Sequence, residues 1–222
     1  MILAVIFDMD GLMFDTERLC TWATEQTGKE MGREGLSGFA KEVIGLREAE
    51  CKRKYFMQFG EEFPFEQFSR RRQEIIDRYI REKGVPVKPG LFELLNFLKR
   101  GGFPMAVATS TSRRHALAYL ERTGAAPYFD QMMFGDMLEN GKPAPDIYLK
   151  AASLLEVAPE DCMALEDSPR GIQSAHAAGM TTVMIPDLLP PDQDDRKRYD
   201  YCVPSLFEVP ALLQKERKEG GT

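Results

Sequence analysis

The segment LAVIFDMDG, residues 3–11, decides the fold of this chain. Its first five residues form a short apolar run, and the composition then changes abruptly to Asp-Met-Asp-Gly at Asp8. A short apolar run that contains β-branched residues and ends at turn residues is typical of a strand buried on both faces, as in a parallel sheet. The run is also too short to cross a membrane. We therefore predict a central parallel strand over residues 3–7, with Asp8 at its carboxyl end.

Four similar apolar runs follow, and they alternate with helical patterns. The runs cover residues 105–109, 131–134, 162–165 and 182–185, and the helical patterns cover residues 91–100, 112–122, 146–155 and 170–178. Strands that alternate with helices of this length indicate right-handed βαβ units. The sequence therefore predicts an α/β fold built on a doubly wound, mostly parallel sheet.

The region after the first strand breaks this alternation. It has helical patterns and no convincing strand, and the patterns cover residues 17–28, 47–59 and 64–83. The prolines of GVPVKPG, residues 84–90, disfavour helix at the residues before them and indicate an extended connection. We therefore predict an α/β catalytic core over residues 1–15 and 84–222 and an inserted helical cap domain over residues 16–83. The cap would sit above the carboxyl ends of the strands, where open α/β sheets bind ligands.

Composition and charge limit the classes of function. The chain has 222 residues, of which 43% are hydrophobic, and a formal net charge of −6 at pH 7. This charge argues against nucleic-acid binding, which normally requires a basic field. The four cysteines are scattered without metal-ligand spacing, and the N-terminus shows no basic leader. We expect a cytoplasmic monomer that binds no membrane, with reduced cysteines and with Trp22 in the core of the cap.

The Asp-rich turn after the first strand is the first candidate site. Asp8 ends the strand, and Asp10 can face the same ligand from the following loop. Gly11 allows a tight turn close to a substrate, and an Asp-Thr-Glu sequence follows at residues 15–17. Two neighbouring carboxylates can divide the work between a nucleophile and a proton donor. The alternative is a turn that merely caps a helix, because aspartate favours turns for local reasons.

Two further motifs supply groups that can neutralise a phosphate. Thr109 and Ser110 lie at the end of the second strand, where a hydroxyl and a backbone N–H at a helix N-terminus can donate to phosphoryl oxygens. An ordinary helix cap is the alternative for these residues. Lys142 lies in the loop GKPAPD, residues 141–146, and can act there as a compact positive charge. A solvated surface lysine is its alternative.

Glu166 and Asp167 form a second acidic cluster at the end of the fourth strand. Adjacent carboxylates near Asp8 would repel one another unless a cation lay between them. A site made of oxygen ligands suits Mg²⁺. For Glu166 taken alone, a helix-capping carboxylate is an equal alternative.

Together the four motifs resemble those of the haloacid dehalogenase superfamily, in particular its phosphatases with a helical cap, the group that includes β-phosphoglucomutase. They occur in the order that this family has, and the resemblance spans nearly the whole chain. It implies a Rossmann-like core and a Mg²⁺-dependent phosphatase that hydrolyses a small phosphate ester, such as a sugar phosphate, through an aspartyl phosphate. In this reading Asp8 is the nucleophile, Asp10 is the acid and base, and Thr109 and Lys142 assist catalysis.

The resemblance also implies the metal ligands. The Mg²⁺ ligands would be Asp8, the backbone carbonyl of Asp10, and Asp167, with Glu166 as a direct or water-mediated partner. Beside these, the candidate substrate contacts are Gly11, Ser110 and Arg47, the last within the cap segment IGLRE, residues 44–48.

Two alternatives remain open. A phosphosugar mutase would carry a histidine on the first cap helix where this chain has Cys20, and Arg47 lies one position away from the mutase pattern. The basic run at residues 70–72 faces either the site or solvent, and a solvated helical face is the more common arrangement.

A non-catalytic phospholigand sensor is the second alternative, although such domains lack a cap of this size and a carboxylate equivalent to Asp10. Dehalogenation is disfavoured for the same reason, because the family's dehalogenases have no acid at that position.

Overall fold

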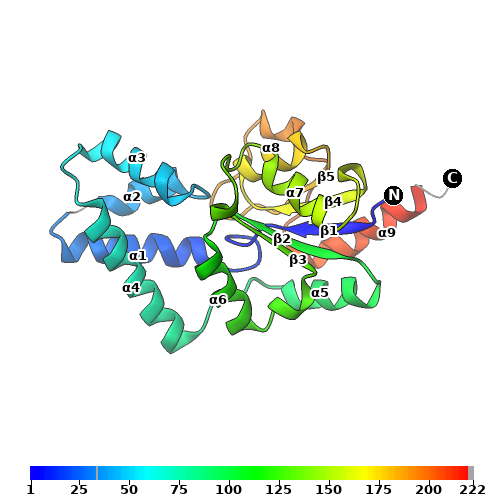
Figure 1. The fold of residues 1–222 in the computed structure, drawn as a ribbon, viewed down its shortest axis with the longest axis horizontal. Coiled ribbons are helices and arrows are strands. Elements are labelled where there is room, and N and C mark those ends of the chain that lie inside the picture. Colours follow the sequence, from blue (N-terminus) through cyan, green and yellow to red (C-terminus); the bar gives the residue numbers. More distant parts are fainter. Residues whose placement is uncertain (34, 220–222) are drawn as a thin grey trace.

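Among residues 1–33 and 35–219, which the computed structural model describes, six parallel strands form one sheet in the order β3-β2-β1-β4-β5-β6 (Figure 1). The strands are β1 (Ala4–Phe7), β2 (Met105–Thr109), β3 (Gln131–Phe134), β4 (Cys162–Glu166), β5 (Thr181–Met184) and β6 (Tyr201–Cys202). The prediction of a doubly wound parallel sheet is confirmed, and each of the five predicted strands is present. The strand β6 was not predicted because it has only two residues, which carry no detectable period.

Alternate side chains of each strand pack on opposite faces of the sheet. In β1, Val5 and Phe7 belong to one apolar cluster, whereas Ala4 and Ile6 belong to another. The first cluster includes α5 (Leu91–Arg100), α6 (Arg113–Thr123) and α9 (Val209–Glu219), and the second includes α7 (Asp146–Leu154) and α8 (Pro169–Ala177). Every residue of β1 is buried, as its continuous apolar run predicts. Helices cover both faces of the sheet. The carboxyl ends of the strands point toward the cap (Figure 1).

A helical insert follows β1 and lies at the carboxyl end of the sheet (Figure 1). Its helices are α1 (Thr16–Glu30), α2 (Leu36–Ala40), α3 (Glu48–Phe59) and α4 (Phe65–Lys83). An aromatic cluster around Tyr55, Phe63 and Phe68 holds α3 and α4 together. The prediction that Trp22 is part of the cap core is wrong, because its side chain is 43% exposed and packs at the surface against Tyr79.

The two connections between the sheet and the insert run side by side. The N–H of Asp15 donates to the carbonyl of Pro86 at 2.8 Å, and the N–H of Lys88 donates to the carbonyl of Met13 at 2.9 Å. The two covalent connections between the core and the insert therefore lie at one place. The exact division at residues 15, 16, 83 and 84 stays a prediction.

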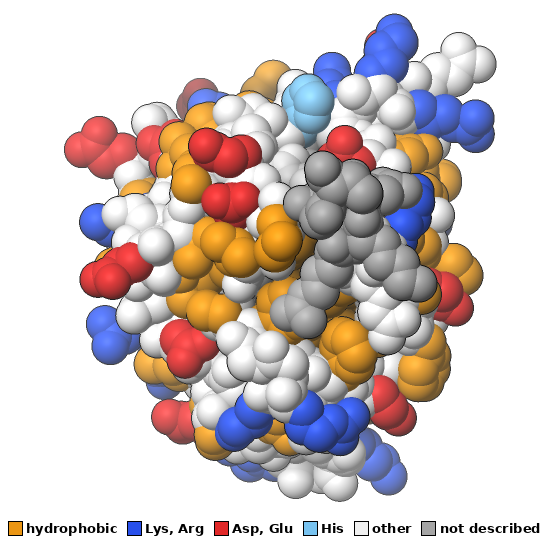
Figure 2. Space-filling model, turned by 90° about the vertical axis from the view of Figure 1, so that its right-hand side faces the viewer, with side chains coloured by type: hydrophobic (Ala, Val, Ile, Leu, Met, Phe, Trp, Pro, Cys, Tyr) orange, Lys and Arg blue, Asp and Glu red, His pale blue; other side chains and the backbone are white. Residues whose placement is uncertain are grey.

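The face of the core remote from the insert carries a mixed surface. Figure 2 shows acidic and basic side chains interspersed on it, with hydrophobic side chains between them. Across the described part of the chain, no helix is both long enough and apolar enough to span a membrane. The four cysteines are free thiols.

Candidate active site

Three acidic side chains from adjacent strands meet at the carboxyl edge of the sheet. Phe7 of β1 is in register with Leu165 of β4, so Asp8 and Glu166 leave the sheet side by side. Asp167 follows directly, and the carboxylate oxygens of Asp8, Glu166 and Asp167 lie within 4.8 Å of one another. All three residues are buried. The predicted convergence of the two acidic motifs is therefore present in the structure.

Lys142 joins this cluster from the loop before α7. Its Nζ atom lies 2.5 Å from Asp8 Oδ1 and 2.5 Å from Glu166 Oε1, and the residue is only 4% exposed. Although burial alone would lower the pKa of Lys142, Asp8 and Glu166 raise it above its ordinary value. Lys142 is therefore a permanently charged, buried ammonium and not a solvated surface lysine.

The carboxylate of Glu166 is fully occupied by donors of the protein. Tyr148 Oη donates to Glu166 Oε1 at 2.6 Å, and Ser168 Oγ donates to Glu166 Oε2 at 3.2 Å. With Lys142 also bound, Glu166 orients the ammonium and has little capacity left for another ligand. This geometry favours Glu166 as an outer partner of a metal over a direct ligand.

The charge of the cluster fits a divalent cation. Burial raises the pKa of Asp8 well above its ordinary value, against the opposing effect of Lys142. Burial and the charges of Asp8 and Glu166 also raise the pKa of Asp167 well above its ordinary value. A cation between Asp8 and Asp167 would remove this repulsion, and their oxygen atoms suit a hard divalent ion. The acidic cluster thus supports a divalent metal site, without identifying the ion.

Two glycines make room for the acidic side chains. At Gly11, whose φ is +88°, an added Cβ would lie 2.1 Å from Asp167 Oδ2. At Gly171 in the first turn of α8, an added Cβ would lie 1.9 Å from the carboxyl carbon of Glu166. Gly11 therefore serves both the turn and the close approach of Asp167, and its contact with a substrate stays a prediction.

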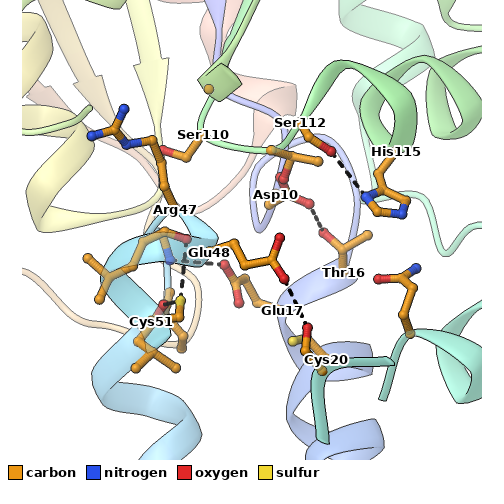
Figure 3. Close-up of a pocket in the computed structure, with 18 of the residues that line it drawn as sticks. Asp10, Thr16, Glu17, Cys20, Arg47, Glu48, Cys51, Ser110, Ser112 and His115 are labelled. Atoms are coloured by element: carbon orange, nitrogen blue, oxygen red, sulfur yellow. Dashed lines mark hydrogen bonds between the residues drawn. The ribbon is translucent and has the colours of Figure 1, made fainter. Parts of the chain in front are cut away.

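Three threonine hydroxyls hold the carboxylate of Asp10. Thr16 Oγ1 donates to Asp10 Oδ1 at 2.6 Å, and Thr111 Oγ1 donates to Asp10 Oδ2 at 2.7 Å. Thr109 Oγ1 lies 3.2 Å from the same Oδ2 atom. Thr16 begins α1, Thr109 ends β2 and Thr111 follows β2, so Asp10 is positioned by both the core and the insert. Figure 3 shows the hydrogen bond between Thr16 and Asp10.

A cavity of about 1130 Å³ opens above these residues, between the sheet and the insert. Asp8, Asp10, Ser110 and Lys142 line it from the core. The cap contributes Glu17, whose Oε1 accepts a hydrogen bond from the N–H of Gly45 at 3.3 Å. Burial, and to a lesser extent the charge of Asp10, raises the pKa of Glu17 to about 8.

Arg47 lines the cavity from the cap but is held by the core. Its Nη1 atom donates to the carbonyl of Leu138 at 3.0 Å, and its side chain packs against Gly141. In Figure 3 the guanidinium points away from Asp10. A direct contact between Arg47 and substrate therefore stays a prediction, whereas its link between cap and core is part of the structure.

Sequence reasoning missed the supporting residues of the site. Thr16 and Thr111 were not assigned to Asp10, and neither Tyr148 nor Ser168 was assigned to Glu166. The available signal was spacing, because Thr16 begins the helix after the Asp-rich turn and Ser168 follows the second acidic pair. Tyr148 offered no such signal, since nothing in the sequence distinguishes it from an ordinary buried helix residue.

Comparison with known proteins agrees with this geometry. A family model described as haloacid dehalogenase-like hydrolase matches residues 5–185. Over 180 aligned residues, the chain is 36% identical to the phosphorylated carbohydrates phosphatase of Thermotoga maritima. The alignment covers 81% of this chain and 83% of that protein.

Two solved structures are similar to the whole molecule. CbbY from Rhodobacter sphaeroides, crystallised with xylulose-(1,5)-bisphosphate, has a TM-score of 0.81 and 28% identity and covers 94% of this chain and 96% of that one. β-Phosphoglucomutase from Clostridium difficile has a TM-score of 0.81 and covers 99% of this chain and 98% of that one. At 23% identity, the second likeness supports the fold alone.

Proposed function

The chain belongs to the haloacid dehalogenase-like hydrolase family and is a phosphatase of that family, and from this premise we propose that it hydrolyses small phosphorylated metabolites, such as sugar phosphates, through a phosphorylated Asp8. The main support for the proposal is the buried cluster of Asp8, Lys142, Glu166 and Asp167 at the bottom of the cavity between the sheet and the insert. The phosphatase of T. maritima, which acts on phosphorylated carbohydrates by its name, supports the substrate class.

The proposed metal is Mg²⁺, held by Asp8, the backbone carbonyl of Asp10, and Asp167. When bound, it would supply positive charge against the phosphoryl oxygens and the carboxylates around them. Glu166 would act through Lys142 and through water. Oxygen ligands in a buried acidic cluster support a hard divalent ion.

The proposed reaction has two displacements at phosphorus. First, a carboxylate oxygen of Asp8 attacks phosphorus, the bond to the leaving oxygen breaks, and Asp10 gives its proton to that oxygen. Next, Asp10 takes a proton from water, the water oxygen attacks phosphorus, and the bond to Asp8 breaks to release phosphate. Lys142 lowers the pKa of Asp8 against the effect of burial, and its charge opposes the negative charge on the phosphoryl group. Ser110 and Thr109 would contact the phosphoryl oxygens.

We propose that residues 16–83 act as a lid over this chemistry. The paired connection at residues 13–15 and 86–88 supports movement at a single hinge. Closure would exclude water while Asp8 reacts.

The residue at position 20 favours hydrolysis over the activity of a phosphosugar mutase. Cys20 lines the cavity, and burial raises the pKa of its thiol. A thiol in that state is a poor replacement for a histidine that must exchange protons near neutral pH. Incubation with β-glucose 1-phosphate separates the two activities, because a mutase yields glucose 6-phosphate and a phosphatase yields glucose and free phosphate.

The experiment that tests the proposal is a phosphate-release assay on p-nitrophenyl phosphate and a panel of sugar phosphates in the presence of Mg²⁺. We expect turnover by the native chain and a loss of at least ~10⁴-fold in kcat for Asp8→Asn with the fold intact. Circular dichroism checks the fold. Near-native turnover by a folded Asp8→Asn variant would overturn the proposal.

A further inference from the structure

The loop that carries the buried lysine of the site is held by side chains from both the core and the insert. Residues 138–145 consist of turns, bends and irregular backbone, so their carbonyl groups need partners other than a sheet or a helix. The carbonyl of Leu138 accepts a hydrogen bond from Arg47 Nη1 at 3.0 Å, and the carbonyl of Ala144 accepts one from Ser174 Oγ at 2.6 Å. The loop is therefore fixed near both of its ends.

Arg170 holds the same loop at Lys142 itself. It lies in the first turn of α8, and its Nη2 atom donates to the carbonyl oxygen of Lys142. Because this carbonyl carbon is bonded to the Cα atom of Lys142, the contact fixes the point from which the side chain starts. The side chain is a flexible stem, and its ammonium lies between Asp8 Oδ1 and Glu166 Oε1. Arg170 thus restricts the positions of the ammonium through the backbone.

A glutamate of the insert meets the same guanidinium. Glu50 lies in the first turn of α3, and its Oε1 atom is 3.6 Å from Arg170 Nη2. Its Oε2 atom accepts a hydrogen bond from the N–H of Arg47 at 3.3 Å, which fixes the carboxylate at the start of the helix. An ion pair that is open to solvent adds little stability, so we expect this pair to orient the guanidinium more than to stabilise the fold.

On the basis of the proposed function, we infer that Arg170 is a positioning residue for Lys142 and that Glu50 links this positioning to closure of the insert. With the insert closed, Glu50 and the carbonyl of Lys142 hold the guanidinium from two sides, and the ammonium is placed beside Asp8 and the phosphoryl oxygens. Because Glu50 belongs to the insert and Arg170 to the core, opening separates the pair and leaves the guanidinium with one partner fewer. The charge of Lys142 is then fully in place only when the substrate is enclosed.

The test measures kcat/KM for p-nitrophenyl phosphate with Mg²⁺ in variants of these two residues. We expect Arg170→Met to lower kcat/KM by ~10–100-fold, because a small displacement of a catalytic group is costly. Arg170→Lys retains a donor and a positive charge, and it should recover most of the loss. Glu50→Gln retains an oxygen for the N–H of Arg47 but removes the charge, and it should lower kcat/KM by ~2–5-fold, the effect of losing an ion pair near solvent.

Double variants show whether the two residues act through Lys142. In a Lys142→Ala background, Arg170→Met should change kcat/KM by less than ~2-fold, whereas a separate structural role would cost the same factor in both backgrounds. Glu50→Gln should likewise have no further effect in an Arg170→Met background. A crystal structure of Arg170→Met supplies a second measurement that does not depend on the folding of Lys142→Ala. In it the ammonium of Lys142 should no longer contact both Asp8 and Glu166.

Two surface variants serve as matched controls. Arg71→Met removes an arginine that pairs with Glu30 at the surface, whereas its two neighbours in the basic run at residues 70–72 line the cavity. Glu25→Gln removes a glutamate that pairs with Lys29 on the surface of α1. Both variants should keep the native kcat/KM and the native stability toward urea.

Three results would overturn the inference. They are a native kcat/KM in folded Arg170→Met, an equal loss from Arg170→Met with and without the lysine at position 142, and a structure of Arg170→Met in which the ammonium keeps its place. A loss from Glu50→Gln that persists at full size in Arg170→Met would overturn the link to the insert. Failure of the native chain to hydrolyse p-nitrophenyl phosphate would instead overturn the proposed function and, with it, the inference.

Discussion

At the scale of single residues, Asp8, Asp167 and Lys142 form the buried cluster, and side chains from other segments hold the cluster and Asp10 in place. Asp8, Asp167 and Lys142 occupy strand ends or short loops where a local pattern marks them, and the structure brings them together. Thr111 and Tyr148 are common residue types whose roles depend on contacts with segments far away in sequence. Spacing within one segment carries no information on such contacts.

Asp10 should be needed most for substrates with a poor leaving group. Replacing it by asparagine in Asp10→Asn removes the proton donor but retains a side chain of similar shape for Thr16 and Thr111 to contact. We expect a fall of ~10²–10⁴-fold in kcat/KM for an alkyl phosphate, the usual range for loss of a general acid. The fall for p-nitrophenyl phosphate should be much smaller, because nitrophenolate leaves without a proton. Equal losses for both substrates, measured as the single-turnover rate at which each leaving group is released, would contradict this role of Asp10.

Glu17 should make stability depend on pH. Its folded-state pKa of about 8 lies above the ordinary value of 4.5, so between these pH values the folded chain binds more protons than the unfolded chain. The stabilisation is fully present below pH 4.5 and is lost as pH rises to about 8. Relative to the native chain, Glu17→Gln should therefore gain on the order of 1–3 kcal/mol between pH 5 and pH 8.

Urea unfolding of the metal-free native chain and of Glu17→Gln, at several pH values, measures this difference. Comparison of the two proteins removes the contribution of Asp8, which both share, whereas the pKa of Asp167 also responds to the charge of Glu17. A difference in unfolding free energy that stays constant with pH would show that Glu17 titrates normally.

At the scale of elements, the regular part of the fold was predictable because each strand and helix has its own period. The α5 and β2 bounds agree with the prediction residue for residue, at Leu91–Arg100 and Met105–Thr109. The short helix α2 was missed because its five residues do not complete two turns. The link from Arg47 to Leu138 was also unpredictable, since it depends on how the insert rests on the core.

The contact of α8 with β4 depends on Gly171, where no side chain fits beside Glu166. Gly171→Ala should displace the Glu166 carboxylate from Lys142 and lower stability by ~1–3 kcal/mol, as overpacking does. Activity should fall with it because Lys142 loses its orientation. The control is Gly38→Ala, an exposed helical position with no atom within 4 Å of the added Cβ, where alanine should stabilise by ~0.5–1 kcal/mol. Equal effects in the two variants, measured by urea unfolding, would show that α8 and β4 can separate to accommodate a methyl group.

At the scale of the whole molecule, the fold assembles one site from distant segments. The strand order of the sheet places β1 next to β4. Asp8 therefore lies close to Asp167, although more than half of the chain separates them in sequence. The sequence predicted the convergence because parallel strands present their carboxyl ends at one edge. It could not predict the cavity wall formed by the cap, because those side chains follow no strand end.

A metal ion that bridges distant segments should stabilise the fold. Binding to the folded chain alone adds about 2.7 kcal/mol at a Mg²⁺ concentration of 100 times Kd, so the melting temperature should rise with Mg²⁺ and return with EDTA. EDTA should also abolish phosphatase activity. In Asp167→Asn, which loses a proposed ligand, the rise should be much smaller. A melting temperature of the native chain that does not respond to Mg²⁺, Mn²⁺ or Ca²⁺ would contradict a divalent metal site at the acidic cluster.

The central claim is that phosphate passes through the carboxylate of Asp8, and chemical trapping tests it most directly. In Asp10→Asn, a single turnover of p-nitrophenyl phosphate should release one nitrophenolate per enzyme and leave the acyl phosphate in place, because the base for its hydrolysis is missing. Borohydride reduction followed by peptide mass spectrometry should then find homoserine at position 8. Release of nitrophenolate with an unmodified Asp8, or with the reduced residue at any other position, would contradict the account.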